Sequence, residues 1–524
     1  MLSKVLLYYN TLKFLRWPQV WYRLYYFVRS KIRKFTNFKY KFSIPTNYKW
    51  VKLQNTIGLN QSFFGKNKFV FLNKEKDFSN SINWNFNQFG KLWTYNLNYF
   101  DFLNQVDANK EDSLELINDF IQKLPNLTDA NEPYPISLRL INWVKFLSRN
   151  EITDSKINES LKAQAYILKD KLEYHLLGNH LLENSFGLLF ASYYLQEKPL
   201  FDTANKILRT ELKEQILKDG GHFELSPMYH QIIFIRLLDA YNLVINNAVF
   251  ETDLQNTLKK YAQKMFGWLE QITFSNGDIP HLNDSADEIT PESEKLFEYA
   301  KQLNIKPALL SLTESGYRKI KGNNFEAVID VGEIGPSYLP GHAHADTFNF
   351  VLYWKNKPLI VDIGTSTYET NALRTTERST ENHNTVTINN KNQSQVWGGF
   401  RVAKRANITE LIEKENSIKA SHNGYDDIGV THTREFIWDD TIFEINDIVS
   451  GKPKNAFASF HFAENSIPIK EKEQAYKIND NTISFVGATN IEVNNYSLAI
   501  GFNKNVEAKV LKVYFNNRLT SKIC

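Results

Sequence analysis

The sequence contains a single cysteine, Cys524, at the last of its 524 positions. One thiol excludes an intrachain disulfide, so the fold does not depend on an oxidising compartment. No apolar run approaches the length needed to span a bilayer. The first residues also lack the apolar core and small-residue cleavage site of a signal peptide. From these absences we expect a cytoplasmic or peripheral membrane location, and the periplasm stays open.

Acidic residues are missing from the first 74 positions, which hold 15 of the 62 Lys and Arg residues. Two apolar stripes at helical spacing, separated by Pro18, predict a pair of basic amphipathic helices in this region. We define residues 1–75 as the N-terminal arm. Such helices lie on an anionic membrane surface or pack on the chain's own helical domain, and the sequence leaves both interpretations open. No recognised nucleic-acid-binding module accompanies the charge, so we expect no nucleic-acid partner.

Residues 76–315 have mostly helical periodicity, with short loops rich in Asn, Gly or Pro. The predicted helices are 113–124, 136–146, 157–172, 181–195, 203–217, 228–247 and 254–274. Successive helices with short connections indicate antiparallel hairpins, either bundled or curved into a toroid. A chain of 524 residues is too long for one ordinary domain, so we expect a second domain after this one.

Residues 320–524 show short segments rich in β-branched and aromatic residues, bounded by Gly, Asn or Asp. The predicted strands are 325–331, 348–354, 359–363, 384–388, 441–449 and 456–462. This pattern predicts an antiparallel β-sandwich and an α+β multidomain protein. A site shared by the two domains is expected in the cleft between them.

Two clusters in the helical half carry candidate catalytic groups. Asn179 and His180 follow Gly178 at a predicted helix start, and Glu183 lies on the same helix face as His180. Alone, an Asn-His pair at a helix start is more often a cap than a catalytic pair. Tyr229 is expected in the first turn of another helix, where the helix dipole would lower the pKa of its phenol. The alternative for Tyr229 is a buried phenol held by one hydrogen bond.

Two further clusters lie in the sandwich half. His342 and His344 are two residues apart, which on extended backbone puts both imidazoles on one side, a frequent arrangement for zinc ligands. Residues 362–385 add a carboxylate, a third imidazole and cations suited to an acidic sugar.

Together these clusters resemble the heparinase II/III-like family. The matching motifs are 179–183, 226–230, 341–346, 359–364 and 378–386, and the resemblance spans roughly residues 85–470. The basic N-terminus and residues 93–99 and 133–143 also resemble members found with bacterial exopolysaccharide biosynthesis genes.

The resemblance implies an incomplete α/α toroid followed by an antiparallel β-sandwich. It also implies a polysaccharide lyase that cleaves uronic-acid-containing glycans by β-elimination, with C5 proton abstraction and C4–O cleavage. In that chemistry Asn179 and His180 neutralise the sugar carboxylate, Tyr229 is the general acid and, in some members, also the base, and His342 is the alternate base.

Further residues receive roles from the same resemblance. The expected substrate contacts are Arg139, Glu183, Tyr368 and Arg378. The expected ligands of a structural zinc are His344, Asp362 and His383. The expected partner is an anionic polysaccharide or oligosaccharide.

Two other function classes stay open. An inverting glycoside hydrolase would need two carboxylates at a suitable separation, for which Glu224, Asp278 and Asp284 are candidates. A non-catalytic glycan-binding or assembly component of exopolysaccharide biosynthesis would need no catalytic group.

Overall fold

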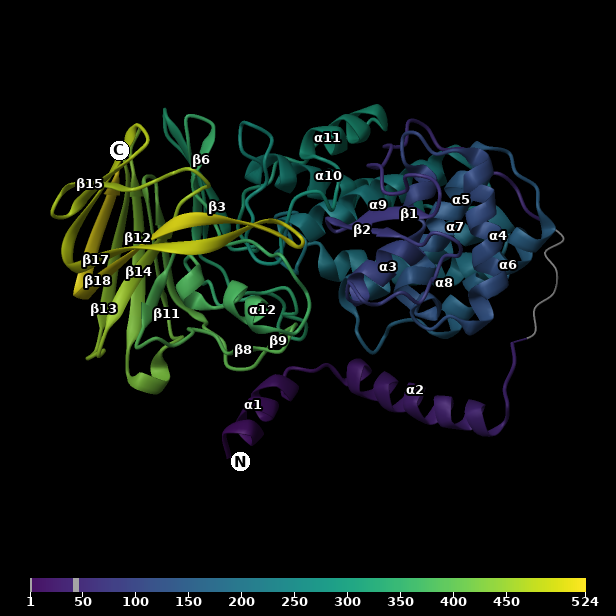
Figure 1. The fold of residues 1–524 in the computed structure, drawn as a ribbon, viewed down its shortest axis with the longest axis horizontal. Coiled ribbons are helices and arrows are strands. Elements are labelled where there is room, and N and C mark those ends of the chain that lie inside the picture. Colours follow the sequence, from purple (N-terminus) through teal and green to yellow (C-terminus); the bar gives the residue numbers. More distant parts are fainter. Residues whose placement is uncertain (1, 41–46) are drawn as a thin grey trace.

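The structure, a computed structural model, describes residues 2–40 and 47–524, and of residues 2 and 3 only the backbone. It has a helical domain, a β-domain beside it and an arm of two helices along one edge (Figure 1). The predicted order of an α/α toroid followed by an antiparallel β-sandwich is confirmed. Predictions for residues 1 and 41–46 of the N-terminal arm lie outside the described residues.

The helical domain contains every helix that the periodicity predicts, and two more. Its helices are α3 Lys91–Tyr99, α4 Lys110–Lys123, α5 Pro133–Arg149, α6 Ser155–Asp170, α7 Gly178–Leu195, α8 Lys198–Gln215, α9 Pro227–Asn246, α10 Leu254–Ile272 and α11 Ser293–Gln302. Only residues 196–197 separate α7 from α8, so the chain must reverse there. Asn109 caps α4 and Asp154 caps α6 through their side chains, which fixes where these helices begin.

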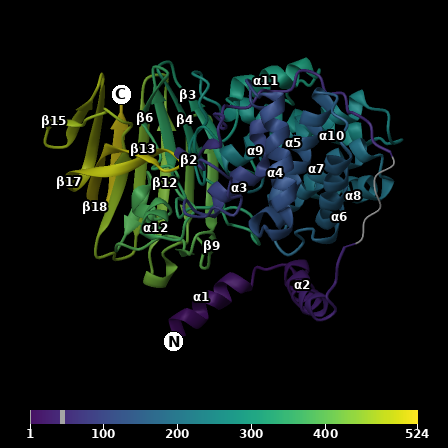
Figure 2. The ribbon, with the colours of Figure 1, turned by 45° about the vertical axis from the view of Figure 1, so that its right-hand side comes forward.

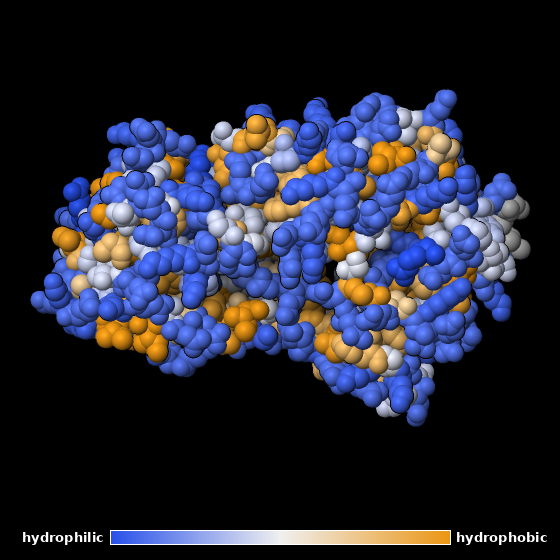
Figure 3. Space-filling view, turned by 90° about the horizontal axis from the view of Figure 1, so that it is seen from above, coloured by the Kyte–Doolittle hydropathy of each residue, from blue (hydrophilic) through white to orange (hydrophobic). Residues whose placement is uncertain are grey.

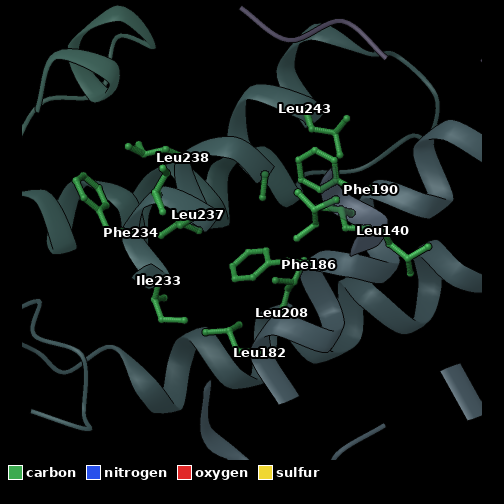
Figure 4. Packing of buried hydrophobic residues seen from close by; sticks show 14 of the residues in the cluster. Leu140, Leu182, Phe186, Phe190, Leu208, Ile233, Phe234, Leu237, Leu238 and Leu243 are labelled. Carbon is green, nitrogen blue, oxygen red and sulfur yellow. The ribbon is translucent and has the colours of Figure 1, made fainter. Parts of the chain in front are cut away.

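Helix α7 lies at the centre of this domain (Figures 2 and 4). Phe186 and Phe190 of α7 pack in one cluster with Leu140 of α5 and with Ile233 and Leu237 of α9. A helix that is apolar on all sides is expected inside a domain rather than on its surface. Every residue of α7 is buried except His180. The one residue of α7 that is substantially open to solvent is therefore His180, a predicted site residue.

The β-domain is built from two main sheets that share one apolar core. The first sheet has the order β3 Tyr317–Lys321, β4 Phe325–Asp330, β5 Phe350–Trp354 and β6 Lys357–Ile360. The larger sheet has the order β10 Ile408–Lys414, β11 Ser417–His422, β12 Thr431–Trp438, β13 Phe443–Ser450, β18 Lys504–Ile523, β17 Asn481–Gly501, β16 Ala475–Ile478 and β15 Ile469–Lys472, with β14 Ala456–His461 joining β18 to β7 Val386–Ile388. Neighbouring strands are antiparallel, as predicted. Loops between the strands carry α12 Ala372–Glu377 and a small hairpin of β8 Val396–Trp397 and β9 Arg401–Val402.

The N-terminal arm forms the two predicted helices, α1 Leu2–Leu12 and α2 Trp17–Phe35. The arm does not continue to residue 75, because Val51, Phe69 and Phe71 are buried in the helical domain's core. Phe69 and Phe71 belong to a hairpin of β1 Lys68–Phe71 and β2 Lys74–Asp77, and Phe71 packs against Trp93. The predicted boundary at residue 75 rests on the position of the first acidic residue, Glu75. The distribution of charge along the sequence does not show which residues pack in a core.

The change from helices to strands falls between Gln302 and Tyr317, and the sequence predicts the domain boundary at residues 315–320. Among the described residues, no helix is both long enough and apolar enough to cross a bilayer.

Candidate active site

A cleft of about 1350 Å³ lies where the arm, the helical domain and the β-domain meet. The arm contributes Arg23, the helical domain His180 and Tyr229, and the β-domain His342 and Tyr368. All four predicted catalytic residues line this cleft: Asn179, His180, Tyr229 and His342.

The first turn of α7 holds Asn179 and His180 at the cleft. Gly178 begins this turn with φ of 59°, and a Cβ there would meet Leu339 and Glu224, so the position favours glycine. Asn179 donates from its side chain to Glu224 over 2.7 Å. His180 contacts Glu173 over 3.1 Å. Burial would lower the pKa of His180, but the Glu173 carboxylate raises it above its ordinary value and so favours the cationic imidazole.

The first turn of α9 holds Tyr229, as predicted. Ser226 caps the helix by accepting from the Tyr229 backbone N–H over 3.2 Å, and Pro227 takes the first helical position. The phenol accepts a hydrogen bond from the Tyr368 hydroxyl over 3.3 Å. The expected lowering of the pKa is wrong, because burial raises the pKa of Tyr229 above its ordinary value. The desolvation of the phenolate outweighs the helix dipole, so this phenol keeps its proton near neutral pH.

Tyr229 and His342 come from different domains and stack against each other. Their ring centroids are 3.9 Å apart, with an angle of 30° between the ring planes. His342 Nε2 lies 3.5 Å from Glu224 Oε2, so the imidazole also faces the side of the cleft that holds Asn179. A phenol from the helices and an imidazole from the β-domain therefore converge on one space.

Asp284, from the segment between α10 and α11, fixes His342 from behind. Its carboxylate contacts His342 Nδ1 over 2.9 Å and His344 Nε2 over 2.9 Å. Both nitrogens of the Arg374 fork donate to the same carboxylate. Burial alone would raise the pKa of Asp284, but Arg374 and the two imidazoles hold it well below its ordinary value. An anionic Asp284 makes His342 Nδ1 the protonated nitrogen, which leaves Nε2 for chemistry in the cleft.

The three predicted metal ligands form one buried group beside this cluster. Ligand atoms of His344, Asp362 and His383 all lie within 4.8 Å of one another. One nitrogen of each imidazole, Nδ1 of His344 and Nε2 of His383, is buried without a hydrogen-bond partner. Burial would raise the pKa of Asp362, but His383 lowers it to about 2, so the carboxylate is anionic. Two unsatisfied imidazole nitrogens beside a carboxylate fit a zinc ion in the donor set that this metal prefers.

Arg139 is not a substrate contact in this structure, contrary to the prediction. Arg139 belongs to α5 and is fully buried, and its guanidinium donates to Gln164, to the Asn98 carbonyl and to the Ala130 carbonyl. These bonds tie α5 to α6, to α3 and to the turn at Asp129–Asn131. The side chain stabilises the helical domain.

Glu183 and Arg378 are also withdrawn from the cleft. Glu183 is fully buried and pairs with Arg236 over 3.4 Å, and burial raises its pKa to about 7. Arg378 is 1% exposed and donates to backbone carbonyls of Ala343 and Gly399. Of the four predicted substrate contacts, Tyr368 alone lines the cleft.

Several groups that complete the site have no distinct signal in the sequence. As sequence positions, Glu224 and Asp284 are only candidate hydrolase carboxylates, whereas in the structure Glu224 holds Asn179 and Asp284 holds both histidines. Arg401 and Arg405 line the cleft near Arg23 of the arm. Their proximity arises from contacts between distant parts of the chain, which no local spacing reveals.

Replacing Asp284 by Asn should destabilise the protein by about 3–5 kcal/mol, because it leaves Arg374 buried without an anion. The free energy of unfolding from urea titrations measures this. Asp278→Asn is the control, since Asp278 is an exposed carboxylate of the same cleft and should cost less than about 0.5 kcal/mol. Equal stability of the two variants would contradict the role given to the Asp284 cluster.

Comparisons with known proteins support the same architecture. The family model described as heparinase II/III N-terminus matches residues 19–306, and the model described as heparinase II/III-like, C-terminal, matches residues 304–511. A heparin-sulfate lyase of Bacteroides stercoris is 26% identical over 317 residues, which cover 54% of this chain and 45% of that protein. The chain thus matches less than half the length of this curated relative.

Solved structures agree with the fold. The crystal structure of a heparinase III has a TM-score of 0.65 at 15% identity and covers 95% of this chain and 89% of that one. A heparan sulfate lyase mutant from Pedobacter heparinus has a TM-score of 0.55 at 18% identity and covers 87% of this chain and 81% of that one. The two family models together span the helical domain and most of the β-domain, so the chain belongs to the heparinase II/III family.

Proposed function

We propose that this protein is a polysaccharide lyase that cleaves a uronic-acid-containing glycan by β-elimination. The observation that carries the proposal is the stacked pair of Tyr229 and His342 in the cleft between the two domains. The curated relatives named heparin-sulfate lyase support the same reaction class.

The reaction makes three demands on the site. The carboxylate beside C5 must be neutralised, because removing the neighbouring proton would otherwise build a second negative charge next to the first. Asn179 and the cationic His180, adjacent in the first turn of α7, are suited to bind that carboxylate. The C5 proton must pass to a base, and the C4 oxygen must gain a proton as its bond to C4 breaks.

The surroundings of Tyr229 and His342 indicate which ring gives a proton and which ring takes one. Tyr229 keeps its proton because burial raises the pKa of its phenol, so it serves as the acid that protonates the departing C4 oxygen. His342 has its Nδ1 bound to Asp284, so Nε2 serves as the base that takes the C5 proton. The electron pair of the C5–H bond forms the C4–C5 double bond while the C4–O bond breaks.

An inverting hydrolase would need two free carboxylates about 6.5–9.5 Å apart. Asp284 is fully buried and committed to Arg374 and two imidazoles, and Glu224 is committed to Asn179. Of the three candidate hydrolase carboxylates only Asp278 stays exposed in the cleft, and one carboxylate does not make the pair that inversion needs, which favours a lyase.

The direct test is a panel of uronate polymers, both glycosaminoglycans and bacterial exopolysaccharides, incubated with the full chain. A lyase produces the ultraviolet absorbance of an unsaturated uronate. New reducing ends without that absorbance would indicate a hydrolase instead. Binding without cleavage of any polymer would indicate a non-catalytic component.

Tyr229→Phe should lower kcat by about 10²- to 10⁴-fold, because the variant has no proton to give to the leaving oxygen. Polymer binding should persist, since the ring and its stacking remain. Tyr317→Phe is the matched control, because its phenol is buried outside the cleft and bonds to the Leu225 carbonyl. A Tyr229→Phe enzyme that turns over like the Tyr317→Phe enzyme would refute the acid role.

We also propose that the acidic polymer runs toward the basic end of the cleft. Arg23, Arg401 and Arg405 line that end, and among the described residues none of them has an ion-pair partner. Burial and then the neighbouring Arg401 lower the pKa of Arg23, so these two cations are close together. Glu333 acts electrostatically on Arg405 but, among the described residues, forms an ion pair with none of the three arginines. This excess of cations suits an anionic ligand.

Arg401→Gln should raise KM by about tenfold with little change in kcat, because it removes a charge-assisted contact that is equal in ground and transition states. Steady-state kinetics on the polymer found by the panel measure this. Arg318→Gln is the control, because Arg318 is paired with Glu413 outside the cleft. An unchanged KM for Arg401→Gln would remove the basic subsite.

We propose zinc as the ion held by His344, Asp362 and His383. The two unsatisfied imidazole nitrogens and the anionic carboxylate support this choice. The ion would brace the β-domain next to the cleft, because His344 also binds Asp284.

The purified protein should contain about one zinc per chain, and chelation should lower its melting temperature. Metal analysis and thermal melts with and without chelator measure both effects. His383→Ala should abolish the zinc content, whereas His422→Gln, a buried histidine outside the group, should keep it. A wild-type protein without bound metal would overturn the assignment.

A further inference from the structure

The N-terminal arm carries an unusual concentration of exposed apolar side chains. Among the described residues, 15 of the 28 large hydrophobic side chains that are exposed lie between Val5 and Phe38. Trp17 is 72% exposed and Phe35 is 90% exposed. On the face seen from above, by contrast, most of the surface is hydrophilic and apolar residues form separate patches (Figure 3). Such a concentration of exposed apolar side chains on two neighbouring helices indicates a docking site.

The arm is held in place by its opposite, polar side. Gln19 is buried and donates to the Leu176 carbonyl over 3.1 Å. Arg29 donates to the Asp170 carbonyl over 2.8 Å, and Arg33 pairs with the Asp170 carboxylate. Tyr22 and Tyr26 add ring contacts with Tyr174 and His175. The arm thus binds the body through hydrogen bonds, ion pairs and a few aromatic contacts, while most of its large apolar side chains stay exposed. Both ribbon views show the arm on the outside of the molecule, along its lower edge (Figures 1 and 2).

The charges of the arm identify what covers this apolar face. No Asp or Glu precedes Glu75, so nothing in the arm would repel an anionic surface. Four lysines of the arm, Lys4, Lys13, Lys31 and Lys34, are exposed and have no ion-pair partner among the described residues.

The aromatic residues point the same way. Trp17 and Trp21 stack with centroids 6.4 Å apart and are both exposed. Indole rings prefer the boundary between lipid headgroups and acyl chains, and lysines beside an apolar helix face bind anionic headgroups. We propose that α1 and α2 lie in the interface of an anionic membrane, with their apolar side chains in the acyl boundary.

This docking would also fix where the cleft opens. Thr11, Leu15, Gln19 and Arg23 of the arm line the cleft. A membrane-bound arm therefore holds the cleft against the lipid headgroups, where a glycan still attached to the membrane would be within reach. The membrane proposal itself does not require the lyase proposal, because vesicle binding is measured without substrate.

The test is co-sedimentation of the full chain with vesicles of phosphatidylcholine alone or mixed with phosphatidylglycerol. Binding should require the anionic lipid and weaken with salt. Trp17→Ser combined with Trp21→Ser, and separately Lys31→Glu combined with Lys34→Glu, should each lower the partition coefficient by about tenfold or more. Leu309→Ser combined with Val486→Ser is the control, because both side chains are exposed in other parts of the surface, and it should bind as wild type does.

A second measurement does not depend on disruptive variants. A fluorophore that senses polarity is attached at Phe35→Cys in a Cys524→Ser background, with Leu309→Cys as the control site. Anionic vesicles should shift the emission to the blue at position 35 and leave position 309 unchanged. Absence of binding, equal shifts at both positions, or a dimer in solution that the Trp17 and Trp21 substitutions abolish would each overturn the membrane proposal.

Discussion

The buried carboxylate of Asp284 is the interaction on which the geometry of the cleft depends. Asp284 follows α10 in the helical half of the chain, yet the groups that bind it, His342, His344 and Arg374, all come from the β-domain. One carboxylate therefore joins the domains, orients the imidazole in the cleft and holds His344, one of the residues to which we assign zinc. Tyr229 and His342 can stack because the domains are fixed to each other at this point.

Burying such an anion has a free-energy cost that the groups around it must offset. A fully buried carboxylate is tolerated only when cations and hydrogen-bond donors replace the water it has lost. Arg374 supplies two donors and a full charge, and the imidazoles supply the remaining contacts. Any motion that separated the domains would break the paired hydrogen bonds between Arg374 and Asp284 and the contacts of Asp284 with both imidazoles. A site held in this way is preorganised, so its dipoles need not reorient during reaction.

Local patterns were sufficient to predict most of the fold. Helical periodicity marked α4 to α10, and short β-branched segments marked β4 to β7, β13 and β14, because these signals lie within one element. The sequence motifs also singled out Asn179, His180, Tyr229 and His342, and the structure places all four in one cleft.

The failed predictions share one cause. Whether Arg139 faces solvent or the core depends on what packs against α5, and the pKa of Tyr229 depends on how completely the cleft desolvates the phenol. The role of Asp284 rests on a partner 58 residues away, His342. Such properties arise from tertiary contacts, which one sequence without an alignment does not reveal.

The N-terminal arm contacts both domains that form the cleft. Through Gln19 it binds Leu176, two residues before the glycine that begins the turn of Asn179 and His180. Through Thr11 and Phe14 it contacts Trp397 and Arg405 in the loops of the β-domain. It thus connects both walls of the cleft, and polar groups of the arm are bonded to the two domains in doing so. A helix pair that uses its polar side to hold the cleft can bury its exposed apolar side chains only in something outside the chain. The absence of acids before Glu75 is why we propose that this partner is anionic.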